Sequence, residues 1–147
     1  MYQTLPSQIG TALMLVLALW AFWRGRAEHR LTAGFIAATW LLSGVLQQRT
    51  VAALFDMQVG IFAMDLIVAG GVTAVAMRWP RLWVQACAAF TWLQLMTHIA
   101  MAVDDRMHWR AYLTALALWS VAQLVSLAWG MTQAELDRRR LRRASRP

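Results

Sequence analysis

The chain has 147 residues, of which 60% are hydrophobic and 14% are charged, and its mean hydropathy is +0.47. This composition excludes an ordinary soluble globular domain and an intrinsically disordered chain, because both contain more charged and polar residues. The only cysteine, Cys87, excludes an intrachain disulfide framework and a thiolate metal cluster. The formal net charge is +7, and all 14 basic residues are arginine.

The sequence contains five apolar stretches with short charged breaks between them. A membrane-spanning helix needs about 20 apolar residues. The five stretches are residues 5–23, 31–48, 59–77, 82–103 and 111–131. They predict an all-α integral membrane bundle of five transmembrane helices, formed as one domain by residues 1–132, with an arginine-rich tail at 133–147. The first stretch is expected to stay as a permanent helix, because its basic residues follow the apolar run, the reverse of a signal peptide.

The second stretch, residues 31–48, is short and is interrupted by Thr39, Ser43 and Gln47. A re-entrant segment there is the alternative, and it would leave four spans with both termini on one side.

The distribution of arginines predicts the orientation. With the C-terminus in the cytoplasm, the inner side carries eleven arginines and the outer side carries three. The inner set is Arg24, Arg26, Arg30, Arg78, Arg81, Arg138, Arg139, Arg140, Arg142, Arg143 and Arg146, and the outer set is Arg49, Arg106 and Arg110. Because cytoplasmic loops are enriched in basic residues, we expect the N-terminus outside and the C-terminus inside a bacterial inner membrane.

Aromatic residues fit this orientation, since tryptophan and tyrosine favour the membrane interface. The inner ends of the predicted spans carry Trp20, Trp23, Trp79, Trp83 and Trp129, and the outer boundary carries Trp109 and Tyr112.

Three polar residues within the predicted spans form a candidate intramembrane site. Asp65 lies in the third span, and Gln94 and His98 lie one turn apart on a polar face of the fourth. The tight turn at 78–81 makes these spans antiparallel, which places Asp65 opposite Gln94 and close in depth to His98. We expect either an interhelical hydrogen-bonded clamp or a site that binds a proton, ion or ligand.

The outer loops place Asp56, Asp104, Asp105 and His108 beside the mouth of this polar face. Carboxylates and imidazoles are suitable divalent-cation ligands, but their spacing here matches no metal motif, so a solvated loop without metal is expected. Haem at His98 would lack a second axial ligand, because His29 belongs to the opposite side. The sequence predicts no cofactor.

The tail residues Arg138, Arg139, Arg140, Arg142 and Arg143 are expected to contact anionic lipid headgroups. We expect no nucleic-acid binding, because no aromatic residues are interleaved with these arginines.

No catalytic motif is present, so an enzyme is not expected. The first functional hypothesis is a non-enzymatic membrane component, such as a subunit, an assembly partner or a structural oligomer, with a protein partner or a second copy of itself. The alternative is a small channel, transporter or sensor that uses Asp65 and His98. A third hypothesis is a holin-like phage lysis protein.

Overall fold

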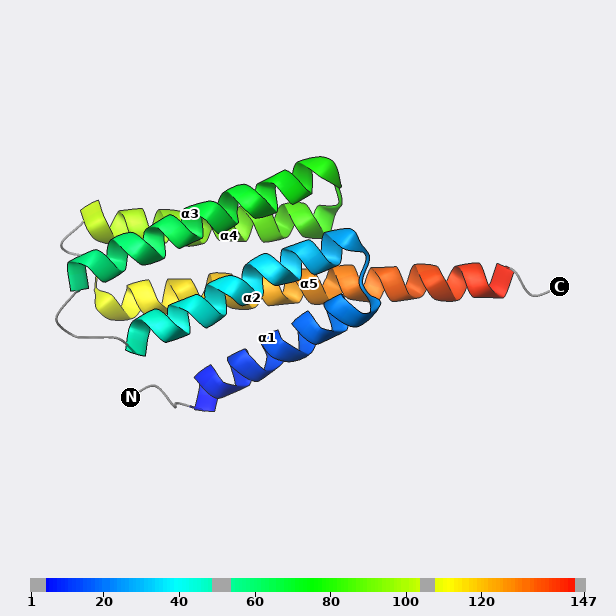
Figure 1. Cartoon of the computed structure of the whole chain (residues 1–147), viewed down its shortest axis with the longest axis horizontal. Coiled ribbons are helices and arrows are strands. Elements are labelled where there is room, and N and C mark those ends of the chain that lie inside the picture. The colour runs from blue at the N-terminus through cyan, green and yellow to red at the C-terminus, as the bar shows by residue number, and fades with distance from the viewer. Residues whose placement is uncertain (1–4, 49–53, 104–107, 145–147) are drawn as a thin grey trace.

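The computed structural model describes residues 5–48, 54–103 and 108–144, and, within them, the side chains of residues 8–42, 62–103, 108 and 110–144. Five α-helices contain nearly all of these residues (Figure 1). They are α1 (Leu5–Arg24), α2 (Ala27–Gln48), α3 (Leu54–Arg78), α4 (Leu82–Val103) and α5 (Trp109–Ala144). No strand occurs within these ranges, and the prediction of an all-α fold is confirmed.

Three helices extend beyond the apolar stretches that predicted them. α2 begins at Ala27 rather than at residue 31, α3 begins at Leu54 rather than at 59, and α5 continues from the apolar stretch to Ala144. Hydropathy identifies only the apolar part of a helix, whereas glutamate, glutamine, leucine and arginine all continue helical hydrogen bonding. The segment predicted as a separate tail is therefore the last part of α5 as far as Ala144.

Two short turns lie at one end of the bundle, which we call the turn end. In the first, the Gly25 amide donates to the Ala21 carbonyl at 2.8 Å. A Cβ at Gly25 would lie 2.2 Å from that carbonyl oxygen, so only glycine fits there. In the second, Pro80 ends α3, and the Arg81 amide donates to the Trp79 carbonyl at 2.7 Å. The opposite end, where α2 and α4 finish and α3 and α5 start, is the loop end.

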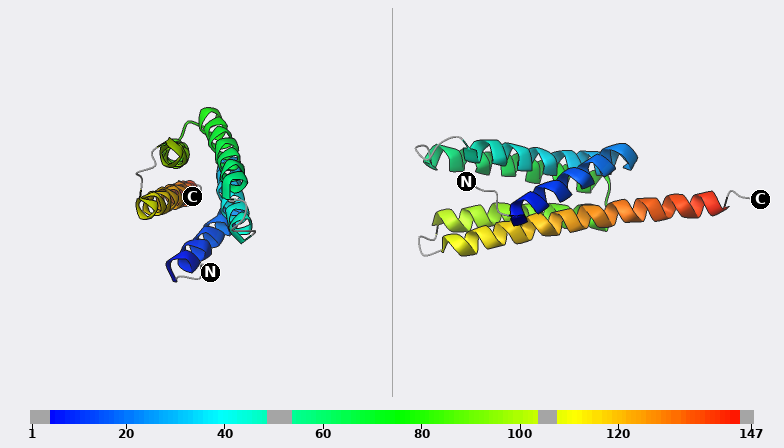
Figure 2. Two further views of the ribbon diagram at one scale, coloured as in Figure 1. Left: turned by 90° about the vertical axis from the view of Figure 1, so that its left-hand side faces the viewer. Right: turned by 90° about the horizontal axis from the view of Figure 1, so that it is seen from below.

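Helices that are consecutive in the chain run antiparallel around a shared interior. Two further views show α2 and α3 on one side and α4 and α5 on the other, while α1 crosses obliquely (Figure 2). α4 packs against both α3 and α5, and α1 packs against α2 and α5. The α3–α4–α5 group is the part that positions the candidate site.

The core lies mainly toward the turn end. Its large, fully buried side chains include Met14, Trp83, Leu124, Leu127 and Met131. Small residues let the helices approach each other, and Gly130 lies so close to Trp83 that an added Cβ would be 2.4 Å from the indole. Trp83 is only 1% exposed, so its indole faces the interior of the bundle rather than the surroundings. The indole packs between α2 and α5, against His29 and Gly130.

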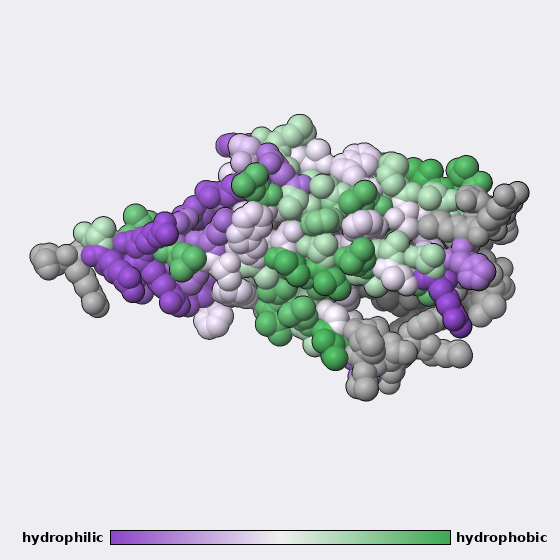
Figure 3. All heavy atoms as spheres, turned by 180° about the vertical axis from the view of Figure 1, so that it is seen from behind, coloured by the Kyte–Doolittle hydropathy of each residue, from purple (hydrophilic) through white to green (hydrophobic). Residues whose placement is uncertain are grey.

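α5 projects beyond the turn end, where its surface becomes strongly hydrophilic (Figures 1 and 3). The body of the bundle is largely hydrophobic on the face that Figure 3 shows. Within the described ranges, α4 and α5 are the two helices long and apolar enough to cross a membrane by length and composition. A core helix of a soluble protein satisfies the same criterion, so this finding is weak evidence for membrane association.

Candidate functional site

Asp65 and His98 are in direct contact. His98 Nε2 lies 2.8 Å from Asp65 Oδ2, and both side chains are largely buried. The turn at Trp79–Arg81 makes α3 and α4 a helical hairpin, which brings the middle of α3 to the same depth as the second half of α4. An ionised carboxylate accepts only, so Nε2 carries the hydrogen in this contact.

Tyr112 extends this contact to a third helix. Its hydroxyl lies 2.8 Å from His98 Nδ1, and the two rings meet edge to face at a centroid distance of 5.6 Å. When His98 is neutral, Nε2 donates to Asp65 and Nδ1 accepts from the tyrosine hydroxyl. We call Asp65, His98 and Tyr112 the outer triad, after the side of the membrane on which the sequence predicts it; it joins α3, α4 and α5. The sequence analysis placed Tyr112 at the outer membrane boundary. Tyr112 follows soon after the α4–α5 connection, and this position in the sequence indicates a depth close to that of His98.

Gln94 does not lie opposite Asp65 as expected. Its amide nitrogen donates to Ser120 Oγ at 3.4 Å, and its Oε1 accepts from Gln123 Nε2 at 3.1 Å. Gln123 Nε2 also donates to Thr91 Oγ1 at 2.9 Å. Gln94 therefore faces α5, whereas His98 on the same helix reaches Asp65 of α3. The polar face of α4 thus contacts two neighbouring helices.

Two tryptophans also make hydrogen bonds between helices. Trp92 Nε1 donates to Thr73 Oγ1 at 3.0 Å between α4 and α3, and Trp119 Nε1 donates to Thr97 Oγ1 at 3.1 Å between α5 and α4. Such bonds between helices hold threonine and indole polar groups away from an apolar exterior.

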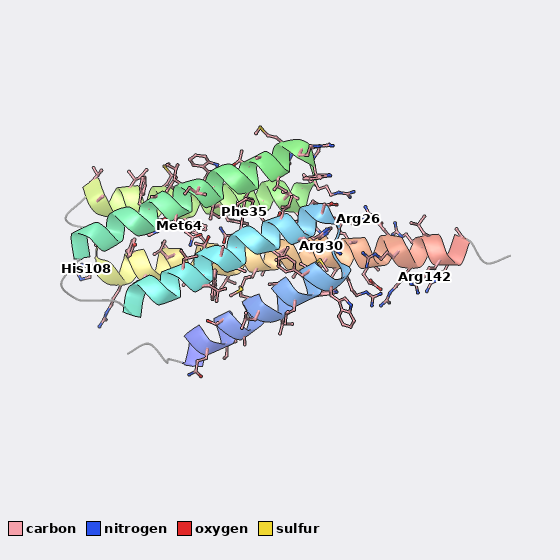
Figure 4. The ribbon with its side chains drawn as sticks, viewed as in Figure 1. Arg26, Arg30, Phe35, Met64, His108 and Arg142 are labelled. Carbon is pink, nitrogen blue, oxygen red and sulfur yellow. The ribbon has the colours of Figure 1, made fainter. Side chains whose placement is uncertain are left out.

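The structure describes only some of the residues that were predicted beside the mouth of the polar face. Asp104 and Asp105 lie outside the described residues, and Asp56 lies in α3 but its side chain is not described. His108 is exposed at the loop end, where its carbonyl accepts from the Tyr112 amide at 3.2 Å (Figure 4). In the part of the chain that the structure describes, no three His, Cys, Asp or Glu side chains are arranged to hold a metal ion.

The basic part of α5 is attached to the end of α1. Arg138 donates to the carbonyl of Arg24, the last residue of α1, and Arg24 also lies 3.8 Å from Glu135. Arg139 lies 3.6 Å from the same glutamate, one helical turn away. The more distal Arg140, Arg142 and Arg143 are exposed, and Arg142 lies well out along the extension in Figure 4. Contact of these arginines with lipid headgroups remains a prediction.

A second ionisable cluster, which the sequence analysis missed, lies at the turn end; it consists of Glu28, His29 and Arg81, and we call it the turn-end cluster. Glu28 and His29 are 4% and 2% exposed, and Glu28 Oε1 is 3.5 Å from Arg81 Nε and 3.9 Å from His29 Nδ1. His29 Nε2 lies 3.1 Å from the Gly130 carbonyl, and its ring stacks on Trp83 at a centroid distance of 4.6 Å. The adjacent Glu28 and His29 just before an apolar stretch were the only signal in the sequence.

Burial lowers the pKa of His29 below its usual value, against a smaller opposing effect of the Gly130 carbonyl and of Glu28. The positive charges of Arg26 and Arg81 lower this pKa further. His29 lies outside the predicted span 31–48, and its burial favours the neutral form.

Comparison with known proteins finds no matching family model, no matching curated protein and no matching solved structure.

Proposed function

We propose that this chain is a multi-pass protein of the bacterial inner membrane with five spanning helices, an outer N-terminus and a cytoplasmic turn end. It acts as a non-enzymatic membrane component that associates with a protein partner or with further copies of itself. In this function, the outer triad is a structural clamp between α3, α4 and α5.

The observation that carries the proposal is the arrangement of side chains about the bundle. Large apolar side chains point outward from every helix, including Leu19 at 68%, Leu41 at 54%, Ile67 at 63%, Met96 at 47% and Val125 at 62% exposure. The polar side chains that make hydrogen bonds between helices instead point toward the neighbouring helices. In water this surface would be an extensive aggregation-prone patch, whereas lipid solvates it favourably.

The burial of the two most apolar helices supports the same proposal. Only 28% of the apolar window of α4 and 22% of that of α5 is buried inside the structure. A core helix of a soluble protein would be mostly buried, because the hydrophobic effect favours removing apolar surface from water.

A second candidate function is a proton-linked transporter or sensor, and the outer triad favours it. Three ionisable side chains lie in one hydrogen-bonded chain, with 2.8 Å between His98 and each of its two partners. Ionisable groups within membrane spans commonly form proton relays.

The substitution Asp65→Asn separates the two functions. The purified variant and the wild type are reconstituted into liposomes that contain a pH-sensitive dye, and their melting temperatures are measured in detergent. For a clamp, the wild type moves no protons, and the variant melts at the same or a higher temperature. Asparagine keeps an acceptor for His98 Nε2 and removes a charge whose insertion into the membrane costs roughly 2.5 to 3.5 kcal/mol.

The matched control is Asp137→Asn, which makes the same chemical change on the α5 extension, away from the triad. If the wild type and Asp137→Asn move protons and Asp65→Asn does not, at unchanged melting temperatures, the clamp is rejected and the proton-linked function is established.

A further inference from the structure

We propose that Glu28 and His29 form a proton-binding site at the turn end, which takes up one proton from the cytoplasmic side when the pH falls. The site lies far along the bundle from the outer triad. Its access from the cytoplasmic side rests on the orientation proposed above, whereas the protonation of His29 itself does not. The ligand is a single proton, delivered by hydronium or water.

The tautomer of His29 follows from its contacts. The Gly130 carbonyl only accepts, so His29 Nε2, 3.1 Å away, carries the hydrogen. In a neutral imidazole the other nitrogen, Nδ1, then has a lone pair and no hydrogen. Nδ1 is buried and makes no hydrogen bond with the described part of the chain.

Nδ1 faces another acceptor. The nearest carboxylate oxygen, Glu28 Oε1, is 3.9 Å away, which is too far for a hydrogen bond. Two buried acceptors that face each other without a hydrogen between them are unfavourable, and one proton satisfies both. After proton transfer to Nδ1, the imidazolium donates to Glu28, and the N–O distance shortens to about 2.8 Å, as in charge-assisted hydrogen bonds.

The surroundings hold the ring in place and set the pH range. Stacking on Trp83 prevents the imidazole from rotating outward, and the indole face favours a cation. The charged groups that act on His29 are Glu28, which favours protonation, and Arg26 and Arg81, which oppose it. On α5, the acidic residue closest in sequence to Gly130 is Glu135. Its carboxylate lies 3.6 to 3.9 Å from the guanidinium groups of Arg24, Arg138 and Arg139.

Proton uptake also changes a contact between elements. Arg81 precedes α4 and lies 3.5 Å from the same oxygen, Glu28 Oε1, that the protonated imidazole would engage. The imidazolium competes with this guanidinium for the carboxylate. The site therefore links cytoplasmic pH to the contact between α2 and the turn at 79–81.

The test is a pH titration of the ¹⁵N-labelled histidines of the full chain in lipid nanodiscs, with His29 assigned by His29→Gln. We expect the ring to be neutral, with its hydrogen on Nε2, at pH 7 and to gain a hydrogen on Nδ1 below the usual histidine range. Glu28→Gln moves this midpoint to lower pH, because it removes the countercharge and supplies an amide donor to Nδ1.

Arg81→Gln moves the midpoint in the opposite direction, because it removes an opposing charge. Its side chain is 45% exposed, so this variant keeps the test valid if Glu28→Gln fails to fold. The matched control is Arg78→Gln at the end of α3, beside the same turn. Its guanidinium lies over Trp79, and we expect a smaller shift of the midpoint. The proposal is overturned if His29 stays neutral down to pH 4, if its hydrogen lies on Nδ1 at pH 7, or if Arg81→Gln shifts the midpoint no more than Arg78→Gln.

Discussion

At the level of single residues, His98 differs from His29 in how its two ring nitrogens are used. Both nitrogens of His98 have partners, Asp65 and Tyr112, whereas His29 uses Nε2 alone for a hydrogen bond. A ring with both nitrogens engaged fixes the relative positions of the helices that supply the partners. A ring nitrogen whose lone pair makes no hydrogen bond, such as His29 Nδ1, can bind a proton without breaking an existing contact.

The contact between Asp65 and His98 should be visible as an energetic coupling. In a double-mutant cycle of Asp65→Ala and His98→Ala, we expect a coupling of about 1 to 2 kcal/mol, because each single variant leaves the other buried partner unpaired. The measurement is thermal or denaturant unfolding in detergent micelles.

A second cycle that combines Asp65→Ala with Thr132→Ala is the control. Thr132 is exposed near the turn end, so these two effects should add within about 0.5 kcal/mol. Equal additivity in both cycles would show that the Asp65–His98 contact carries no stabilising energy.

At the level of helices, close approach depends on a few small residues. At Gly130 of α5 an added Cβ would lie 2.4 Å from the Trp83 ring, which is fully buried and stacked on His29. At Gly70 of α3 an added Cβ would meet no atom within 4 Å. The two glycines have the same chemistry, but only one of them is required by packing.

We expect Gly130→Ala to destabilise the bundle by about 1 to 3 kcal/mol, because Trp83 is fully buried and stacked on His29 and would have to shift. Gly70→Ala should leave stability unchanged or raise it by about 0.5 to 1 kcal/mol, since alanine is the better helix former. Both melting temperatures are measured under identical detergent conditions. A similar loss in the two variants would contradict the packing explanation.

At the level of the whole molecule, both turns and the α5 extension lie at one end, together with most of the arginines. Charge asymmetry of this kind orients a protein in the membrane. The same end carries the turn-end cluster, so the proposed proton site would face the cytoplasm.

Reporter fusions test this orientation. A fluorescent protein that folds only in the cytoplasm should give signal when fused after residues 26, 80 and 147, and no signal at residue 1 or after residues 51 and 106. The reason is the excess of eleven arginines over three on the predicted inner side. Signal at both termini would mean four spans, with residues 31–48 returning to the side from which they entered.

The sequence alone was sufficient for the all-α fold and for the positions of its main helices, because apolar runs, glycine and proline act locally. It also placed Asp65 and His98 at a similar depth, since a tight turn fixes the register of an antiparallel pair. Tertiary structure alone decided that Gln94 faces α5, that Trp83 is buried, and that Tyr112 completes the outer triad. These contacts depend on how each helix is rotated about its axis and packed against two neighbours. The pairing of Glu28 with Arg81, and of His29 with Gly130, joins residues far apart in the chain, so no local pattern could specify it.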